Sequence, residues 1–285
     1  MSLPSWIKKK IPPPGALKEM KELLRSLSLH TVCEEASCPN IGECFSQRTA
    51  TFMILGDRCT RSCGFCGVRK GNPASPDPEE PENIARAVRK LHLEYVVVTS
   101  PARDDLTDGG ASHFALIIKE IKKLAHRIKV EVLVPDFNGS LSSLKRVIEA
   151  GPYVLNHNLE TVPRLYPQVR PEADYLRSLE LLRESKKLDS GIYTKSGLMV
   201  GLGENDKEVT QVMKDLRGVG CDILTIGQYL RPSSQNVPVR EYVPPEKFKE
   251  YEETGKSLGF LSLASSPFVR SSYHAKEIWT HPEKL

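Results

Sequence analysis

Residues 33–66 read CEEASCPNIGECFSQRTATFMILGDRCTRSCGFC and hold six of the chain's seven cysteines. The cysteines form two triplets, which are Cys33, Cys38 and Cys44 (C-x4-C-x5-C) and then Cys59, Cys63 and Cys66 (C-x3-C-x2-C). Between them, residues 50–55 (ATFMIL) form a short apolar run that is typical of a buried strand. We therefore expect the second triplet to lie on a loop at the carboxyl end of that strand.

The sequence after residue 66 alternates between helix and strand patterns. The run at residues 95–99 (YVVVT) is typical of a buried parallel strand. Further strands are expected at 129–134, 153–156, 193–200, 223–228 and 260–264, and helices at 81–91, 111–125, 140–150, 173–187, 206–219 and 245–258. Short connections between such units predict a parallel α/β sheet, which right-handed crossovers curl into a partial or full barrel.

Upstream of the cysteines, residues 16–27 have the apolar spacing of a helix. Residues 12–15 (PPPG) predict an extended linker before it, and Pro39-Asn40 predicts a turn inside the first triplet.

Composition narrows the class of protein. The 285 residues are 39% hydrophobic and 27% charged, and the net charge of +4 is too mild and too dispersed to indicate nucleic-acid binding. No apolar run reaches the ~20 residues of a membrane helix, and the amino terminus lacks the apolar core of a signal peptide. We therefore expect a cytoplasmic protein, in which clustered cysteines bind metal rather than form disulfides.

Three thiolates form a soft, anionic site that suits an iron–sulfur cluster or zinc. Structural zinc normally takes four ligands, and the second triplet has no obvious fourth. A four-iron cluster held by three cysteines leaves one iron open to a small molecule. For the first triplet, three structural thiols or a zinc site completed by His30 remain alternatives.

Polar residues follow several of the expected strands, where parallel barrels bind their ligands. Candidates for cofactor binding are Thr99, Ser100, Asn158, Glu160, Arg170 and Lys195. Loop capping and surface ion pairs are the alternative roles for these residues. Cys221, before a strand, is expected to be a small buried hydrophobe.

The second triplet, on a loop after the first barrel strand, resembles the signature of the radical S-adenosylmethionine (SAM) superfamily. The resemblance implies a partial parallel (β/α)6 barrel of radical SAM type. It also implies that the open iron binds the amino and carboxylate groups of SAM, and that the reduced cluster cleaves SAM to a 5′-deoxyadenosyl radical. Such chemistry needs no general base, so we expect no catalytic residue beyond the cluster ligands.

The residues around the first triplet, LHTVCEEASCPNIGEC (29–44), resemble the lipoyl synthase family. Matching segments include residues 50–57, 103–111, 134–137, 154–162, 166–171, 194–204 and the tail motif RSSY at 270–273. The resemblance implies a radical SAM sulfurtransferase that inserts two sulfur atoms, at C6 and C8, into a protein-bound octanoyl-lysine to form the lipoyl cofactor. It implies two 4Fe-4S clusters, the auxiliary one being the sacrificial sulfur donor.

The auxiliary cluster would be held by the first triplet and by Ser272 of the tail motif, with Ser271 as the fallback ligand. Asn158 and Glu160 would contact the ribose and amino acid portion of SAM, Arg170 and Lys195 its carboxylate or developing charge, and Thr99 and Ser100 its methionine group. A hard serine oxygen is a poorer partner than thiolate for iron–sulfur chemistry, which suits a cluster that is dismantled.

The resemblance also implies a domain plan and partners. We expect an amino-terminal arm and auxiliary-cluster segment (1–48), a radical SAM partial barrel (49–265) and a carboxyl-terminal tail that closes the auxiliary cluster (266–285). The substrate would be an octanoylated lipoyl carrier domain, from the E2 subunit of a 2-oxoacid dehydrogenase or from the glycine cleavage H protein. A flavodoxin or ferredoxin would supply electrons, and a cluster-repair carrier would rebuild the auxiliary cluster.

The sequence departs from the family pattern at several positions, without loss of a ligand. Phe45 replaces a common tryptophan, Gly64 and Gly67 replace common proline and aspartate, and Arg231 and Asn236 also differ. Two other functions compete. A biotin-synthase-like or methylthiolating enzyme is disfavoured by the first triplet and by Ser272, and a cluster carrier would normally give each cluster four cysteines.

Overall fold

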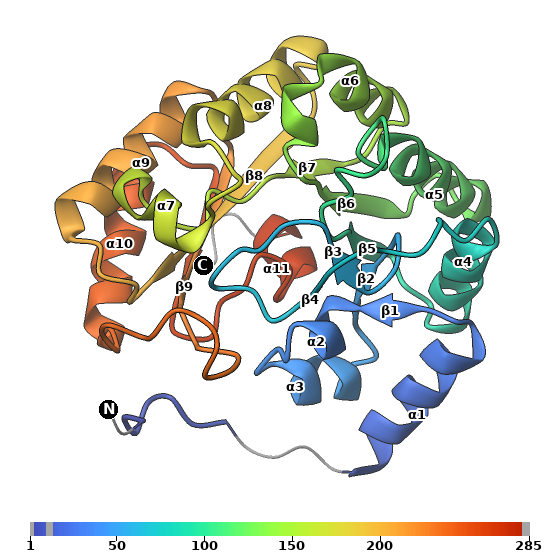
Figure 1. The fold of residues 1–285 in the computed structure, drawn as a ribbon, viewed down its shortest axis with the longest axis horizontal. Helices are drawn as coiled ribbons and strands as arrows, with labels where there is room; N and C mark the ends of the chain where they lie inside the picture. The colour runs from blue at the N-terminus through green and yellow to red at the C-terminus, as the bar shows by residue number, and fades with distance from the viewer. Residues whose placement is uncertain (1–2, 10–13, 281–285) are drawn as a thin grey trace. The chain divides into compact units, whose positions relative to one another are not determined.

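The computed structural model describes residues 3–9 and 14–280, which fall into two compact units (Figure 1). Unit 1 comprises Met1–Lys9, Ser62–Cys66 and Asn156–Leu285, and unit 2 comprises Lys10–Arg61 and Gly67–Leu155. None of the helices in the described ranges is long and apolar enough to cross a membrane.

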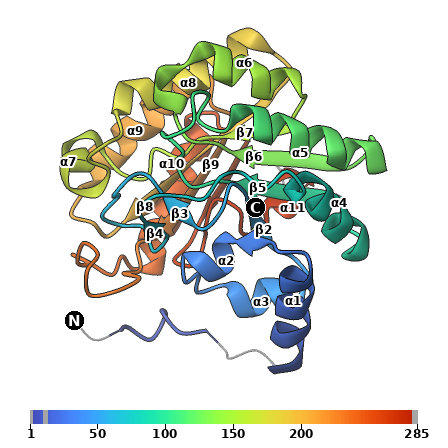
Figure 2. The same ribbon diagram turned by 45° about the vertical axis from the view of Figure 1, so that its right-hand side comes forward.

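Unit 2 carries the amino-terminal half of the sheet and the helices that cover it. Its elements are α1 (Pro14–Ser26), β1 (His30–Thr31), α2 (Val32–Glu35), α3 (Ile41–Ser46), β2 (Thr51–Met53), β3 (Arg58–Cys59), β4 (Arg69–Lys70), α4 (Glu80–Lys90), β5 (Tyr95–Thr99), α5 (Ala111–Leu124), β6 (Lys129–Leu133), η1 (Phe137–Gly139) and α6 (Leu141–Glu149). The strand order is β1-β2-β5-β6, in which only the β1–β2 pair is antiparallel. Helices α4 and α5 lie side by side next to β5 and β6, and α1 packs beside α3 (Figures 1 and 2).

Unit 1 continues the same alternation. Its elements are η2 (Pro163–Leu165), α7 (Tyr166–Val169), α8 (Tyr175–Leu188), β8 (Tyr193–Val200), α9 (Asp206–Gly218), β9 (Ile223–Gln228), α10 (Pro245–Ser257), β10 (Ser262–Ser265) and α11 (Ala275–Thr280). Strands β8, β9 and β10 are parallel neighbours. Strand β7 (Val154–Asn156) precedes them, and its last residue belongs to unit 1 and its first two to unit 2.

The strand order of the whole sheet is β1-β2-β5-β6-β7-β8-β9-β10, with β1 and β10 as end strands. The sheet described here is therefore open, which decides between the partial and the full barrel in favour of the partial one. The predicted strands at 95–99, 193–200 and 223–228 have the bounds of β5, β8 and β9. All three are buried nearly throughout; β5 and the start of β9 read as apolar or β-branched runs, whereas β8 carries Lys195, Ser196 and Gly197 in its middle.

Three expectations near the cysteines need correction. Pro14 and Gly15 belong to α1 rather than to the extended linker, because a proline is compatible with the first helical turn; residues 12 and 13 lie outside the described residues. The strand expected at 50–55 ends at Met53, since Leu55 takes a left-handed conformation with φ of 65°. Cys59 lies on β3, which pairs in parallel with β4, rather than on a loop.

Candidate metal and cofactor centre

The first triplet lies in unit 2, on and between two short helices. Cys33 is on α2, Cys44 is on α3, and Cys38 lies in the connecting turn that Pro39-Asn40 predicted. Thr31 caps α2 by accepting a hydrogen bond from the Glu34 amide at 3.3 Å. Local capping thus fixes the helix that carries the first ligand.

The three thiols of this triplet lie within electrostatic reach of one another. Cys33 is buried, whereas Cys38 and Cys44 are half-buried, and none of the three is in a disulfide. Burial first, and then the charges of Cys38 and Cys44, raise the pKa of Cys33 to about 12. Three thiols whose charges act on one another form a soft donor set once they are deprotonated, and the irons of a cluster supply the positive charge that favours their thiolate forms. The donor set therefore fits the expected cluster.

His30, the alternative zinc ligand, makes a different contact. Its Nδ1 lies 3.3 Å from Glu35 Oε1 on α2. Within residues 3–9 and 14–280, no three His, Cys, Asp or Glu side chains are close enough together to hold a single metal ion.

The first cysteine of the second triplet, Cys59, is in unit 2, and its sulfur accepts two backbone hydrogen bonds. The donors are the amides of Arg61, at 3.4 Å, and Ala102, at 3.3 Å. Amides directed at a sulfur favour its thiolate form, which is the form that binds iron.

Arg61 lies between the first two cysteines of the second triplet and holds this segment of the chain through its buried side chain. Its buried guanidinium donates to both carboxylate oxygens of Asp104 (2.7 and 2.8 Å), to Asp136 (2.6 Å) and to Asn138 (2.8 Å). These hydrogen bonds lower the pKa of Asp104 below its ordinary value. The sequence analysis missed Arg61, although its place inside the motif was a signal.

A second group of buried charges holds Leu55, the residue with left-handed backbone after β2. The Leu55 amide donates to Glu80 Oε2 (2.9 Å), and the Leu55 carbonyl accepts from Arg103 Nη1 (2.8 Å). His113 Nε2 lies 2.6 Å from the same Glu80 oxygen. Both backbone groups of a strained residue are therefore satisfied by charged side chains, which fixes where the chain leaves β2.

Cys63 and Cys66 lie in the short segment of unit 1 that runs from Ser62 to Cys66. The Asn236 side-chain amide donates to the carbonyls of Gly64 (3.2 Å) and Cys66 (2.9 Å). A Cβ on Gly64 would stand 2.8 Å from the Gln168 carbonyl oxygen, so only glycine fits there. Two departures from the family pattern, at 64 and 236, therefore act together to seat this segment.

Asn158 and Glu160, the predicted SAM ligands, meet in unit 1. Asn158 Nδ2 donates to Glu160 Oε1 at 2.9 Å, while the buried Asn158 Oδ1 has no partner in the described residues. Burial raises the pKa of Glu160 above its ordinary value, against the opposing effects of the Arg170 charge and the Asn158 hydrogen bond. A half-buried carboxylate and a buried amide oxygen without a partner in the described residues suit the ammonium and hydroxyl groups of SAM.

Arg170 lies against the same group, with Nη1 donating to the Asn158 (2.8 Å) and Leu159 (3.1 Å) carbonyls. Its buried Nε has no partner in the described part of the chain. Lys195, on β8, is 1% exposed. Arg170 Nη1 therefore fixes the backbone at Asn158 and Leu159, and Arg170 Nε remains as a donor for a ligand.

Thr99 and Ser100 lie in unit 2 and differ in availability. Thr99 Oγ1 donates to the Leu133 carbonyl at 3.0 Å. Ser100 Oγ is buried and finds no hydrogen-bond partner among the described residues. Of the two, Ser100 is the hydroxyl that a ligand can use.

The two serines of the tail motif, in unit 1, also differ. Ser271 Oγ accepts a hydrogen bond of 2.7 Å from Asn158 Nδ2. The half-buried Ser272 hydroxyl makes no hydrogen bond in the described ranges. The Ser271 oxygen is therefore already hydrogen-bonded to Asn158, whereas the Ser272 oxygen is available to a ligand.

The predicted residues thus form separate groups within each unit. Unit 2 brings together Cys33, Cys38 and Cys44, and also holds Cys59, Thr99 and Ser100. Unit 1 brings together Asn158, Glu160, Arg170 and Ser271 through hydrogen bonds and charge interactions, and it also holds Cys63, Cys66, Lys195 and Ser272. Cys221 is fully buried, as expected.

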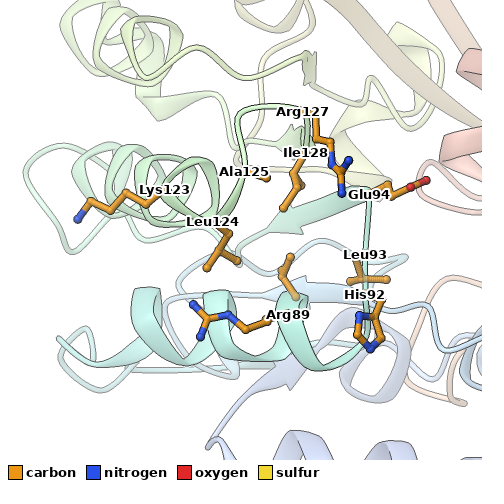
Figure 3. A pocket seen from close by; sticks show the side chains of 10 residues that line it. Arg89, His92, Leu93, Glu94, Lys123, Leu124, Ala125, Arg127 and Ile128 are labelled. Carbon is orange, nitrogen blue, oxygen red and sulfur yellow. The ribbon is translucent and has the colours of Figure 1, made fainter.

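A cavity of about 430 Å³ in unit 2 contains none of these residues (Figure 3). It lies at the amino ends of β5 and β6, where exposed Arg89, His92 and Arg127 line it together with Glu94. Within the same unit, Thr99 and Ser100 lie at the opposite, carboxyl end of β5, so the cavity is separate from these two residues.

Comparison with known proteins assigns the family. The model of the Radical SAM superfamily matches residues 53–216, and that of the N-terminal domain of lipoyl synthase matches residues 1–38. The lipoyl synthase of Caldicellulosiruptor saccharolyticus is 59% identical over 274 residues, covering 96% of both chains. That of Caldanaerobacter subterraneus subsp. tengcongensis is 59% identical over 272 residues, covering 95% of both.

Solved structures of low identity share the fold. Methylornithine synthase (PylB) superposes with a TM-score of 0.53 and 15% identity, over 80% of this chain and 69% of its own. HydG, a maturase of the FeFe-hydrogenase, superposes with a TM-score of 0.57 and 15% identity, over 89% of this chain and 57% of its own. With its two cysteine triplets, its open parallel sheet and these full-length relatives, the chain belongs to the lipoyl synthase family of radical SAM enzymes.

Proposed function

We propose that the chain inserts two sulfur atoms, at C6 and C8, into an octanoyl chain carried in amide linkage on a lysine of a lipoyl carrier domain. The observation that carries the proposal is the pair of cysteine triplets in a chain whose relatives are lipoyl synthases along nearly their whole length. One triplet suits radical formation, and the other, with its own three thiolates, suits sulfur supply.

Each triplet is assigned one four-iron cluster, the first completed by Ser272 and the second left open for SAM. When bound, the clusters and SAM supply the electron, the hydrogen-abstracting radical and the sulfur, the auxiliary cluster being consumed. The chain's own part is to hold thiolates. For Cys59 it directs two amides at the sulfur, whereas Cys33, whose pKa burial raises to about 12, would lose its proton only on binding iron.

Ser272 rather than Ser271 is our choice for the oxygen ligand. Ser271 already accepts a hydrogen bond from Asn158, whereas the Ser272 hydroxyl has no partner in the part of the chain described. The free hydroxyl can lose its proton to bind iron without breaking a contact.

SAM is assigned to the group around Asn158. Glu160 would accept from the SAM ammonium, Asn158 Oδ1 would accept from a ribose hydroxyl, and Arg170 Nε would donate to the carboxylate. Thr99, Ser100 and Lys195 complete the proposed contacts at the ends of β5 and in β8.

The domain plan, partners and setting belong to the same proposal. Residues 1–48 would form the arm and auxiliary-cluster segment, 49–265 the catalytic barrel and 266–285 the closing tail, of which 281–285 lie outside the described residues. The substrate is the octanoylated E2 or H-protein domain, a flavodoxin or ferredoxin is the reductant, and a cluster carrier restores the auxiliary cluster. A reducing cytoplasm keeps the thiols available.

The test is turnover by the anaerobically reconstituted chain, supplied with SAM, a reductant and an octanoyl-lysine peptide. We expect lipoyl-lysine peptide, with two molecules of 5′-deoxyadenosine formed for each. Formation of 5′-deoxyadenosine without sulfur in the peptide would contradict the proposal, and so would sulfur at a single carbon as the final product.

A further inference from the structure

The tail motif lies on a specific seat in unit 1, which we call the tail seat and which consists of Asn158, Gly197 and Gly227. Asn158 follows β7, Gly197 is on β8, and Gly227 is on β9. The tail returns along this edge, with the Ser266 amide donating to the Ile226 carbonyl at 3.1 Å. The tail is therefore fixed to the strands immediately before it reaches residues 270–273.

The two glycines of the tail seat are present because side chains would displace the tail. A Cβ on Gly197 would stand 2.7 Å from Ser271 Oγ and 2.8 Å from Asn158 Oδ1. A Cβ on Gly227 would overlap the Val269 carbonyl oxygen and stand 3.1 Å from Arg270 Nη1. Neither glycine has positive φ, so close approach, rather than backbone conformation, explains both.

Ser271 makes a side-chain hydrogen bond that joins the tail motif to this seat. Asn158 Nδ2 donates to Ser271 Oγ at 2.7 Å and to Glu160 Oε1 at 2.9 Å. One amide group therefore spans the proposed SAM-binding carboxylate and the tail.

We propose that Ser271 is a positioning residue that couples SAM binding at Asn158 to the placement of Ser272. The inference rests on the proposed roles of Asn158 and Ser272 and adds a role for the first serine of the motif. The hydroxyl of Ser271, held over Gly197, fixes the peptide that presents Ser272. When SAM binds and orders Asn158, the Ser272 oxygen is held in the position in which it would bind the auxiliary cluster.

The test compares Ser271→Ala with Ser266→Ala in the reconstituted full-length chain. Ser266 is the matched control because it lies in the same tail and its hydroxyl makes no hydrogen bond in the described ranges. The first readout is hydrogen exchange of residues 269–273 with and without SAM. We expect SAM to protect these amides in the wild type and in Ser266→Ala. In Ser271→Ala they should exchange about fivefold faster with SAM present, the effect of one lost hydrogen bond.

The second readout is lipoyl product per 5′-deoxyadenosine, which should fall about fivefold in Ser271→Ala. In a double-mutant cycle, Ser271→Ala should add nothing in an Asn158→Ala background, because the two residues act through one bond. Unchanged SAM-dependent protection in Ser271→Ala, or independent effects of the two substitutions, would overturn the inference.

Ser272→Ala separates this inference from the proposed function. If Ser272 is the cluster ligand, its loss weakens sulfur insertion while the SAM-dependent protection of residues 269–271 persists. Full sulfur insertion by Ser272→Ala would overturn the ligand assignment, and with it the coupling to that ligand.

Discussion

Asn236 illustrates how a single side chain can hold a metal-binding segment without binding metal. Its amide group donates to the carbonyls of Gly64 and of Cys66, the last cysteine of the second triplet. The same loop supplies the Val237 amide, which donates to the Gly64 carbonyl at 3.0 Å. Removal of the side chain should therefore loosen the second triplet and leave its ligands intact.

We predict that Asn236→Ala increases the rate at which a chelator removes iron from the second triplet by up to about thirtyfold. Two hydrogen bonds are lost, each with a net contribution of about 1 kcal/mol. The measurement is made in a Cys33→Ala, Cys38→Ala, Cys44→Ala background, so that only the second triplet retains its thiols. Gln235→Ala, at the exposed neighbouring position, is the control. Equal chelation rates for the two variants would contradict the assigned role of Asn236.

Asp104 gives a prediction about acid stability. Hydrogen bonds from Arg61 lower its pKa in the folded chain below the unfolded value of about 3.9. Its contribution to stability is therefore complete above about pH 4, and it is lost as the pH falls through the lowered folded pKa.

Asp104→Asn should reduce the free energy of unfolding by about 1 kcal/mol at neutral pH, because the side chain is partly exposed. Below pH 4 the difference from wild type should shrink. Denaturant titrations across this pH range test the prediction, with exposed Glu149→Gln as the control. If the difference in the free energy of unfolding between wild type and Asp104→Asn grows on acidification, the pKa of Asp104 is not lowered in the folded chain.

Helices α4 and α5 do more than cover the sheet, because each sends a buried side chain to the end of β2. Glu80, at the start of α4, accepts from the Leu55 amide, and His113 of α5 contacts the same carboxylate. The packing of two helices thus determines the direction in which the chain leaves β2 towards Cys59.

Glu80→Ala should lower the free energy of unfolding by about 2 kcal/mol, because it leaves the buried Leu55 amide without an acceptor. Hydrogen exchange at Leu55 should accelerate in parallel. Glu82→Ala, on the exposed face of the same helix, should change stability by no more than about 0.5 kcal/mol. If Leu55 exchange is unaffected by Glu80→Ala, the carboxylate does not hold the strand end.

Elements with a strong repeating pattern were predictable from sequence, and those shaped by tertiary contacts were not. Strand β5 is β-branched from Val96 to Thr99, and α6 follows a serine cap at Ser140, so both had a local signal. The two-residue strands β1 and β3 have no such signal, because their pairing with β2 and β4 decides them.

The candidate centre was predictable in its ligands and not in its supports. Cysteine spacing reveals thiolates directly, whereas Arg61 and Glu80 look like ordinary surface charges until the fold buries them. Asn236 could be recognised as a departure, but only its contacts to Gly64 and Cys66 explain it.

The chain as a whole divides the cysteines unevenly between its two units. Cys33, Cys38, Cys44 and Cys59 belong to unit 2, and Cys63 and Cys66 belong to unit 1. We infer that these six thiols bind two four-iron clusters, three thiols to each.

Iron and sulfide counting on three anaerobically reconstituted chains tests this claim most directly. The three chains are the wild type, a Cys33→Ala, Cys38→Ala, Cys44→Ala variant and a Cys59→Ala, Cys63→Ala, Cys66→Ala variant. We predict about eight irons and eight sulfides for the wild type and about four of each for either variant, as two independent four-iron clusters require. A wild type that binds only about four irons, or a triple variant that keeps all eight, would contradict the account.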